Sequence, residues 1–164
     1  MLADRLRYPV IGIGDMKREI AQKAWMTILE RDQMGWNNPD KAREHDIQFD
    51  EYQKSLPLDS NIILDSKLWF YNQPNSFKVF INVADDVWAE RVFAAQRDSD
   101  ARTSYEEVLQ INAQRHQWHK ENYKKLYNVD IFDMSHYDLV IDTTYMTPDE
   151  AFALIVDKFN NFSY

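Results

Sequence analysis

Short apolar runs alternate with longer amphipathic stretches along the 164 residues of the chain. The apolar runs are rich in β-branched residues and are bounded by turn residues, a pattern typical of buried strands. Four strands are predicted, at 8–13, 62–64, 77–83 and 137–142. Buried strands that alternate with helices indicate an α/β domain in which a parallel sheet is flanked by helices.

Apolar side chains at helical spacing predict the helices between these strands. Met16, Ile20, Ala24 and Ile28 recur every four residues, and they favour one helix that continues to about residue 31. Asp15 is a suitable N-cap for this helix. Other helices are expected near 40–56, from 85, from 104 to about 127 with a bend or interruption, and after the capping box at 147–150.

The composition of the chain narrows the classes of function. Twenty-seven acidic residues against nineteen basic ones give a formal net charge of −8, which argues against a protein that coats nucleic acid. The absence of cysteine excludes disulfides, thiolate metal sites and cysteine nucleophiles. No apolar run is long enough to span a bilayer, and the first residues do not resemble a secretory signal. A cytoplasmic protein is expected, with an oligomeric state that the sequence leaves open.

Polar residues follow the first two predicted strands, where parallel α/β sheets usually bind their ligands. Gly14, Asp15 and Arg18 come after the first strand, and Asp65 and Lys67 come after the second. This mixture of acidic and basic groups suits a small phosphorylated and hydroxylated molecule. Polar residues also serve simply to cap and solvate strand ends, so both interpretations stay open at this stage.

The third quarter of the chain is rich in basic residues. Arg97 and Arg115 belong to this region and have the planar guanidinium that can grip a phosphate with two hydrogen bonds. The alternative is a solvated helix face with partners one turn away, as between Glu121 and Lys125. His116 and His119 share a helix face, but two ligands make an incomplete metal site, so no metal site is predicted.

Several stretches, taken together and in order, resemble the cytidylate kinase-like branch of the P-loop nucleoside monophosphate kinases. The resemblance covers nearly the whole chain. Its most specific piece is Asn-Tyr-Lys-Lys-Leu-Tyr-Asn-Val-Asp at 122–130. The other pieces lie at 3–6, 14–21, 62–68, 78–83, 89–92, 135–143 and 148–150.

The resemblance implies a single kinase-like domain over 1–164, with an acceptor-binding segment at about 14–60 and a lid-like region at about 97–128. The implied activity is transfer of a phosphoryl group from ATP, with Mg²⁺, to CMP or dCMP. Dephospho-coenzyme A or another small hydroxylated acceptor is an alternative substrate.

Roles for individual residues also follow from the resemblance. Gly14, Asp15 and Arg18 match the segment that holds the acceptor phosphate, and Asp65 and Lys67 match the lining of the acceptor pocket. Arg115, together with Arg97, would close over the donor phosphates as catalytic groups. Two positions depart from the family pattern. Lysine stands at 67 and asparagine at 122, where the family usually has arginines.

The largest departure is the absence of a Gly-x-x-x-x-Gly-Lys-Ser/Thr loop, which holds ATP phosphates and Mg²⁺ in these kinases. The resemblance places this loop after a first strand in the centre of the sheet. We expect that the sequence begins at an internal methionine and lacks about 15–20 residues, roughly one strand, a loop and part of a helix. The alternative is a natural relative that binds a nucleotide or a protein without catalysis. In either case this chain alone is expected to be inactive.

Overall fold

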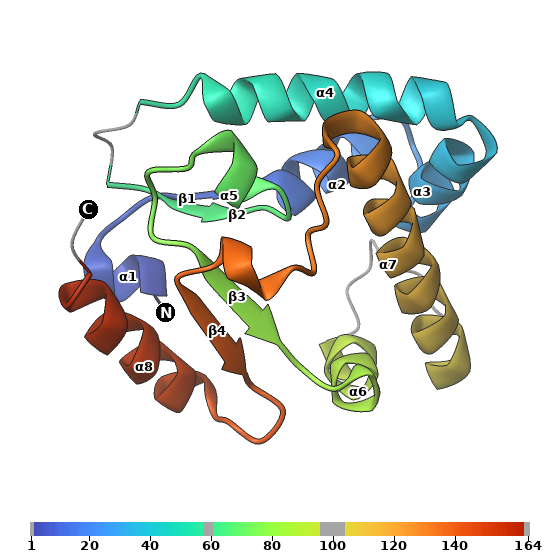
Figure 1. Cartoon of the computed structure of the whole chain (residues 1–164). Helices are drawn as coiled ribbons and strands as arrows, with labels where there is room; N and C mark the ends of the chain where they lie inside the picture. Colours follow the sequence, from blue (N-terminus) through green and yellow to red (C-terminus); the bar gives the residue numbers. More distant parts are fainter. Residues whose placement is uncertain (1, 58–60, 96–103, 163–164) are drawn as a thin grey trace.

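A computed structural model describes residues 2–57, 61–95 and 104–162 of the chain, and Figure 1 shows its arrangement. The elements follow one another in this order: α1 (Leu2–Leu6), β1 (Val10–Gly12), α2 (Ile13–Lys23), α3 (Ile28–Asn37), α4 (Pro39–Lys54), β2 (Ile63–Asp65), α5 (Trp69–Asn72), β3 (Val79–Asn82), α6 (Asp85–Ala95), α7 (Tyr105–Tyr127), a 3-10 turn (Met134–His136), β4 (Leu139–Asp142) and α8 (Pro148–Asn160). None of the described helices is both long and apolar enough to cross a membrane.

The four predicted strands are present and they pair in parallel, but as two separate pairs. β1 pairs with β2, with Gly12 opposite Asp65, and β3 pairs with β4, with Asn82 opposite Asp142. Within the described residues no ladder joins the two pairs, and Figure 1 shows them apart. The parallel strands flanked by helices confirm the predicted α/β class, and in the described residues they form two pairs rather than a single sheet.

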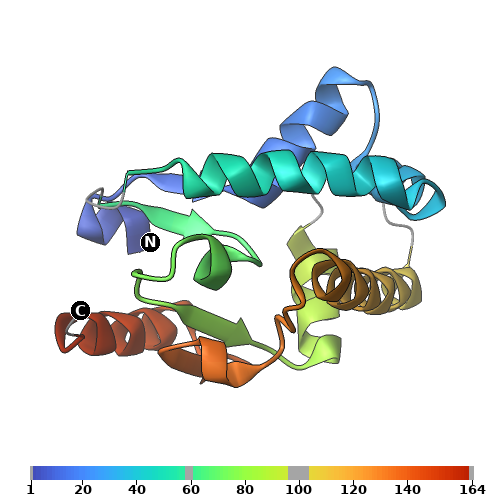
Figure 2. The ribbon, with the colours of Figure 1, turned by 45° about the horizontal axis from the view of Figure 1, so that its top comes forward.

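A cavity of about 1280 Å³ lies between the two strand pairs. Every residue of β2 and of β3 lines it, together with side chains from α1 and α8. Ile81 in β3 leaves 57% of its surface exposed, which is unusual for a strand residue of this type. Figure 2 shows the same separation of the pairs from a second direction. β2 and β3 are the inner strands of the two pairs. Each of them has one edge that faces the cavity and that no described strand pairs with.

The helix predicted through residue 31 is divided into α2 and α3. Trp25 adopts a left-handed conformation, with φ of 57°, and this turns the chain between the two helices. Thr27 begins α3 with a capping box, because its Oγ1 accepts from the Glu30 N–H and its own N–H donates 2.7 Å to Oε2 of Glu30. The capping signal therefore outweighs the apolar spacing. The N-cap of α2 is Gly12, and Asp15 lies in the first turn instead.

A buried cluster joins the end of β2 to the C-terminal half of α7. Its members are Leu68, Phe70, Tyr123 and Ile131, and Leu68 has no exposed surface. α7 itself is one uninterrupted helix, in contrast to the predicted bend, and Ser104 caps it by accepting from the Glu107 N–H. Because Leu68 directly follows Lys67, this cluster fixes the backbone from which the Lys67 side chain leaves.

Leu68→Ala should lower the free energy of unfolding by about 3 kcal/mol, because it removes a fully buried side chain and leaves a cavity. Urea unfolding followed by circular dichroism measures this difference. Ile20→Ala is the matched control, since Ile20 is 47% exposed and its truncation should cost less than about 1 kcal/mol. Equal losses for the two variants would show that the cluster is not the centre of the core.

Candidate functional site

The ends of β1 and β2 bring the predicted acceptor residues to one edge of the first strand pair. Gly12 lies opposite Asp65 in the ladder, and each is the last residue of its strand. The first turn of α2 and the segment after β2 therefore begin side by side at the same edge of the strand pair. Asp65 and Lys67 line the cavity, whereas Gly14, Asp15 and Arg18 are not among its lining residues. The structure thus groups the five residues at one edge but places only two on the cavity wall.

Arg18 folds back over the first turn of its own helix. Its guanidinium pairs with the Asp15 carboxylate one turn earlier, and its Nη atoms come within 3.6 Å of the position that a Cβ on Gly14 would occupy. Gly12 is still more restricted, because a Cβ there would lie 2.6 Å from Oδ2 of Asp15. The small residues at 12 and 14 therefore give the Asp15–Arg18 pair the space that it occupies.

Lys67 is the most perturbed lysine of the site. The residue is exposed through the cavity, but desolvation by the surrounding protein, followed by repulsion from Arg115 and Lys17, lowers the pKa of its ammonium to about 8. In the described part of the chain its ammonium makes no hydrogen bond or ion pair. A cation that is desolvated, repelled and without a partner is arranged to receive an anion.

Arg115 is held by Asp32 of α3, across 83 positions of sequence. Its Nε donates to Oδ2 of Asp32 at 2.8 Å, and its Nη2 lies 2.7 Å from the same oxygen. The two side chains are only 21% and 22% exposed. Sequence reasoning named Arg115 but missed Asp32, since nothing in the local pattern around 32 indicates a partner so far along the chain.

Lys17 is a third cation near this site, and it was also missed. It pairs with the buried Asp46 at 2.7 Å, and its ammonium lies 5.3 Å from the centre of the Phe49 ring. Its position at 17 could have suggested the site, because it lies directly before Arg18. Lys17 and Arg115 each have a carboxylate partner, whereas in the described part of the chain Lys67 forms no ion pair and is only partly compensated by the charges of Asp32 and Asp65.

His116 and His119, which were predicted to share a face of α7, both lie within electrostatic range of Lys67. His116 lines the cavity and meets the Phe132 ring edge to face. His119 is stacked on Tyr123, and its Nδ1 is buried without a hydrogen-bond partner among the described residues. Burial first, and then the positive charge of Lys67, holds the pKa of His119 well below its usual value. Within the described ranges, no three His, Asp or Glu side chains are grouped so as to hold a metal ion.

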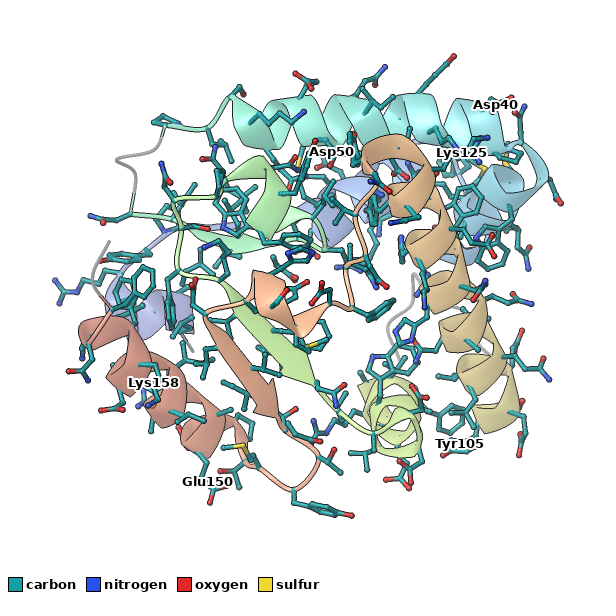
Figure 3. The ribbon with its side chains drawn as sticks, viewed as in Figure 1. Asp40, Asp50, Tyr105, Lys125, Glu150 and Lys158 are labelled. Atoms are coloured by element: carbon teal, nitrogen blue, oxygen red, sulfur yellow. The ribbon has the colours of Figure 1, made fainter. Side chains whose placement is uncertain are left out.

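Asn122 does not lie on the cavity, although the resemblance aligned it with a lid arginine. It is 1% exposed, donates to Oδ2 of Asp46 at 3.0 Å and accepts from Nε of Arg43 at 3.0 Å. Nearby, the Tyr127 hydroxyl donates to Oδ2 of Asp50 at 2.7 Å, and Figure 3 labels Asp50 on α4. These contacts attach the C-terminal half of α7 to α4. Arg97, the other predicted lid arginine, lies outside the described residues.

The residues of this chain do not fit the phosphates of ATP or their Mg²⁺. A phosphate nest needs consecutive backbone N–H groups that converge, usually through a residue in the left-handed conformation. In the described part of the chain positive φ occurs at Arg7, Trp25 and Asn128, and at none of the three glycines of the sequence. No Gly-Lys-Ser/Thr triplet exists to supply the lysine and the hydroxyl.

Comparison with known proteins gives a family match over most of the chain. The sequence profile of the cytidylate kinase-like family matches residues 1–145. A cytidylate kinase from Pyrobaculum islandicum is 27% identical over 154 residues, which are 93% of this chain and 79% of that protein. A cytidylate kinase from Thermoplasma acidophilum is 30% identical over 161 residues, which are 95% of this chain and 81% of that protein.

Two further matches are to a longer protein and to a solved structure. An S-adenosylmethionine-dependent nucleotide dehydratase from Lacinutrix mariniflava is 28% identical over 96% of this chain, which corresponds to only 32% of that longer protein. The crystal structure of an uncharacterized protein from Eubacterium ventriosum aligns with a TM-score of 0.64 over 98% of this chain and 88% of its own, at 14% identity. The second match supports the fold alone.

Lys67→Met should stabilise the protein at pH 7, although it removes a predicted site residue. The lowered pKa means that the folded state holds the Lys67 ammonium at a cost below about pH 8, and this cost disappears as the pH rises toward the value of a free lysine. Because water in the cavity screens the charge, we expect a gain of about 1 kcal/mol, or roughly 2–4 °C.

Thermal unfolding of both proteins at pH 7 and at pH 9.5 measures this gain. It should be present at the lower pH and shrink at the higher one. Lys23→Met, at an exposed position of α2, is the control and should leave the midpoint nearly unchanged. A Lys67→Met protein that is less stable than the wild type at pH 7 would contradict the account of Lys67 as an unpaired, desolvated cation.

Proposed function

The chain belongs to the cytidylate kinase-like family, and from this premise we propose that it forms the acceptor-binding part of a nucleoside monophosphate kinase that phosphorylates CMP or dCMP with ATP. The observation that carries the proposal is the Lys67 ammonium on the wall of a large cavity, where no described side chain forms an ion pair with it. A nucleotide phosphate bound there would supply a negative partner for the Lys67 ammonium.

The acceptor phosphate is proposed to bind between Lys67 and the first turn of α2. In the described part of the chain Arg18 pairs with Asp15, whose side chain is 72% exposed, while the Arg18 side chain is 27% exposed. Because solvent screens the carboxylate side of this pair, a phosphate could compete with Asp15 for the guanidinium. Asp65, beside Lys67 on the cavity wall, is available to accept from a hydroxyl or amino group of the nucleoside.

The donor side needs a structural element that this chain does not contain. We propose that a further parallel strand belongs between β2 and β3, and that the loop after it carries the Gly-Lys-Ser/Thr group for ATP and Mg²⁺. The cavity supports this position, as do the inner edges of β2 and β3, with which no described strand pairs. Arg115 and Arg97 would then act from α7 and the segment before it. This lid-like role is part of the proposal.

The alternative is a non-catalytic module that binds a nucleotide or another protein. The missing phosphate loop favours this reading. A similar segment also occurs inside the longer nucleotide dehydratase. The two functions differ in one outcome, which is whether restoring the strand and the loop restores phosphoryl transfer.

Arg18→Ala should weaken CMP binding about tenfold or more while it leaves cytidine binding nearly unchanged, because a charge-assisted contact to phosphate is worth about 1.5–3 kcal/mol. Isothermal calorimetry with both ligands provides the comparison. Lys23→Ala is the control, since it removes an exposed cation from the same helix. Equal losses for CMP and cytidine would remove Arg18 from the phosphate site.

The 164-residue chain should show no ATP:CMP phosphoryl transfer, because none of its glycines has positive φ and no Gly-Lys-Ser/Thr group is present. A chain extended at its N-terminus by a strand and a Gly-x-x-x-x-Gly-Lys-Ser/Thr loop should be active and more stable. Coupled ADP release and thermal unfolding test both statements. Turnover by the 164-residue chain alone would refute the account, and an extended chain that is stable but inactive would favour the binding module.

A further inference from the structure

His116 and Lys67 line the same cavity, although they come from different elements of the fold. Lys67 follows β2, and His116 lies in α7. The His116 ring meets the Phe132 ring edge to face, with 5.5 Å between the ring centres. Phe132 in turn packs against the buried cluster that contains Leu68, the residue directly after Lys67. Packing contacts therefore bring this face of α7 to the part of the cavity wall where β2 ends.

One turn earlier on α7, Asn112 connects the same helix face to the end of β3. Its Nδ2 donates to Oδ1 of Asp85 at 3.1 Å, and both residues line the cavity. Positions 112 and 116 are four apart, so they share a face of the helix. α7 packs beside α6, which begins at Asp85 (Figure 1). This face of α7 thus adjoins the carboxyl ends of both inner strands, where parallel α/β proteins usually bind their ligands.

The ring nitrogens of His116 make no hydrogen bond or ion pair in the described part of the chain. The residue is half-buried, and its side chain reaches the cavity. Lys67, on the same wall, also has no ion-pair partner among the described side chains. An imidazole and an ammonium that face one cavity without acceptors are both available as donors to a bound ligand.

The charged and titratable groups around His116 come from three elements. Lys67, after β2, disfavours the charged imidazole, whereas Asp85, at the start of α6, favours it. His119, on α7 itself, is kept neutral by its burial. Desolvation has the largest effect on His116, and together with Lys67 it holds the pKa of the ring below its usual value. In the ligand-free protein the His116 ring is therefore mainly neutral at pH 7.

We propose that His116 is a second phosphate-binding residue of the cavity, which donates a hydrogen bond to the nucleotide phosphate that Lys67 attracts. This inference rests on the proposed function, because the phosphate is the one that the acceptor nucleotide carries. A bound phosphate offsets the repulsion between Lys67 and a charged imidazole. It therefore raises the pKa of His116 in the complex, and the ring takes up a proton from solvent when CMP binds below about pH 7.

Calorimetry with CMP at pH 6.0 and at pH 8.5 tests the proposal on the full chain. At pH 6.0, His116→Gln should bind CMP about tenfold more weakly than the wild type, because a charge-assisted contact is lost. At pH 8.5 the loss should shrink to about threefold or less, since only a neutral donor is removed. Cytidine binding should change little at either pH. His45→Gln, at an exposed position of α4, is the control and should match the wild type.

Proton uptake gives a readout that a merely structural role of His116 would not change. Calorimetry at pH 6.5 in buffers of different ionisation enthalpy measures the protons that accompany CMP binding. The wild type should take up more protons than His116→Gln. The CMP phosphate also titrates in this range, but it contributes equally to both proteins, so the difference belongs to His116.

A ligand-free measurement separates the failure of this inference from the failure of the proposed function. NMR titration of the imidazoles should give a higher pKa for His116 in Lys67→Met than in the wild type, and this experiment leaves position 116 unchanged. An equal value in both proteins would show that the two groups are not neighbours and would overturn the inference.

The binding outcomes are equally decisive. CMP affinity and proton uptake that His116→Gln leaves unchanged would also overturn the inference, while the proposed function would stand. If the wild-type chain binds no CMP, the proposed function fails and this inference fails with it. Should His116→Gln not fold by circular dichroism, His116→Asn replaces it in the same comparison.

Discussion

The inner edges of β2 and β3 carry backbone N–H and C=O groups that face a cavity instead of a neighbouring strand. Backbone groups of this kind are obligatory hydrogen-bond formers, and nearly all of them are paired in native proteins. Among the described residues no strand pairs with these edges. The open edges occur together with the separation of the strands into two pairs, the cavity of about 1280 Å³ and the exposure of Ile81.

The chemistry of the site depends on the same opening. Lys67 leaves the end of β2 beside the cavity, and the buried Leu68 that follows it anchors the backbone against α7. The fold therefore holds a cation in a place where burial and the charges of Arg115 and Lys17 disfavour it. A protein tolerates such a local cost where it serves binding, since groups with perturbed pKa values gather at functional sites. Lys67 and the inner edge of β2 both face the same cavity.

Local signals in the sequence identified most of the elements, because the relevant interactions are short in range. The capping box at Thr147 and the apolar run at 62–64 depend on residues a few positions apart, and both predicted elements are present. The break after α2 was missed although Thr27 and Glu30 carry the same capping signal, because the apolar spacing around it was given more weight. Lys67 was found from its place after a strand.

Features that depend on contacts between distant segments were not predictable in the same way. A strand's hydrophobic pattern does not show which neighbour it pairs with, so the pairs β1–β2 and β3–β4 could not be predicted from the apolar runs alone. The partners Asp32 and Arg115 are separated by 83 positions, and no periodicity links them. The resemblance to a kinase family supplied the roles of single residues, but it did not show that Asn122 would be buried against Asp46.

Amide hydrogen exchange at β2 and β3 tests the central claim most directly. We expect the amides on the inner edges of these two strands to exchange rapidly in the 164-residue chain, because no described strand pairs with them. In a chain extended at its N-terminus by one strand and a phosphate loop, the same amides should become protected while those between β3 and β4 change little. Equal and strong protection in both proteins would show that these edges are already satisfied and that no strand belongs between them.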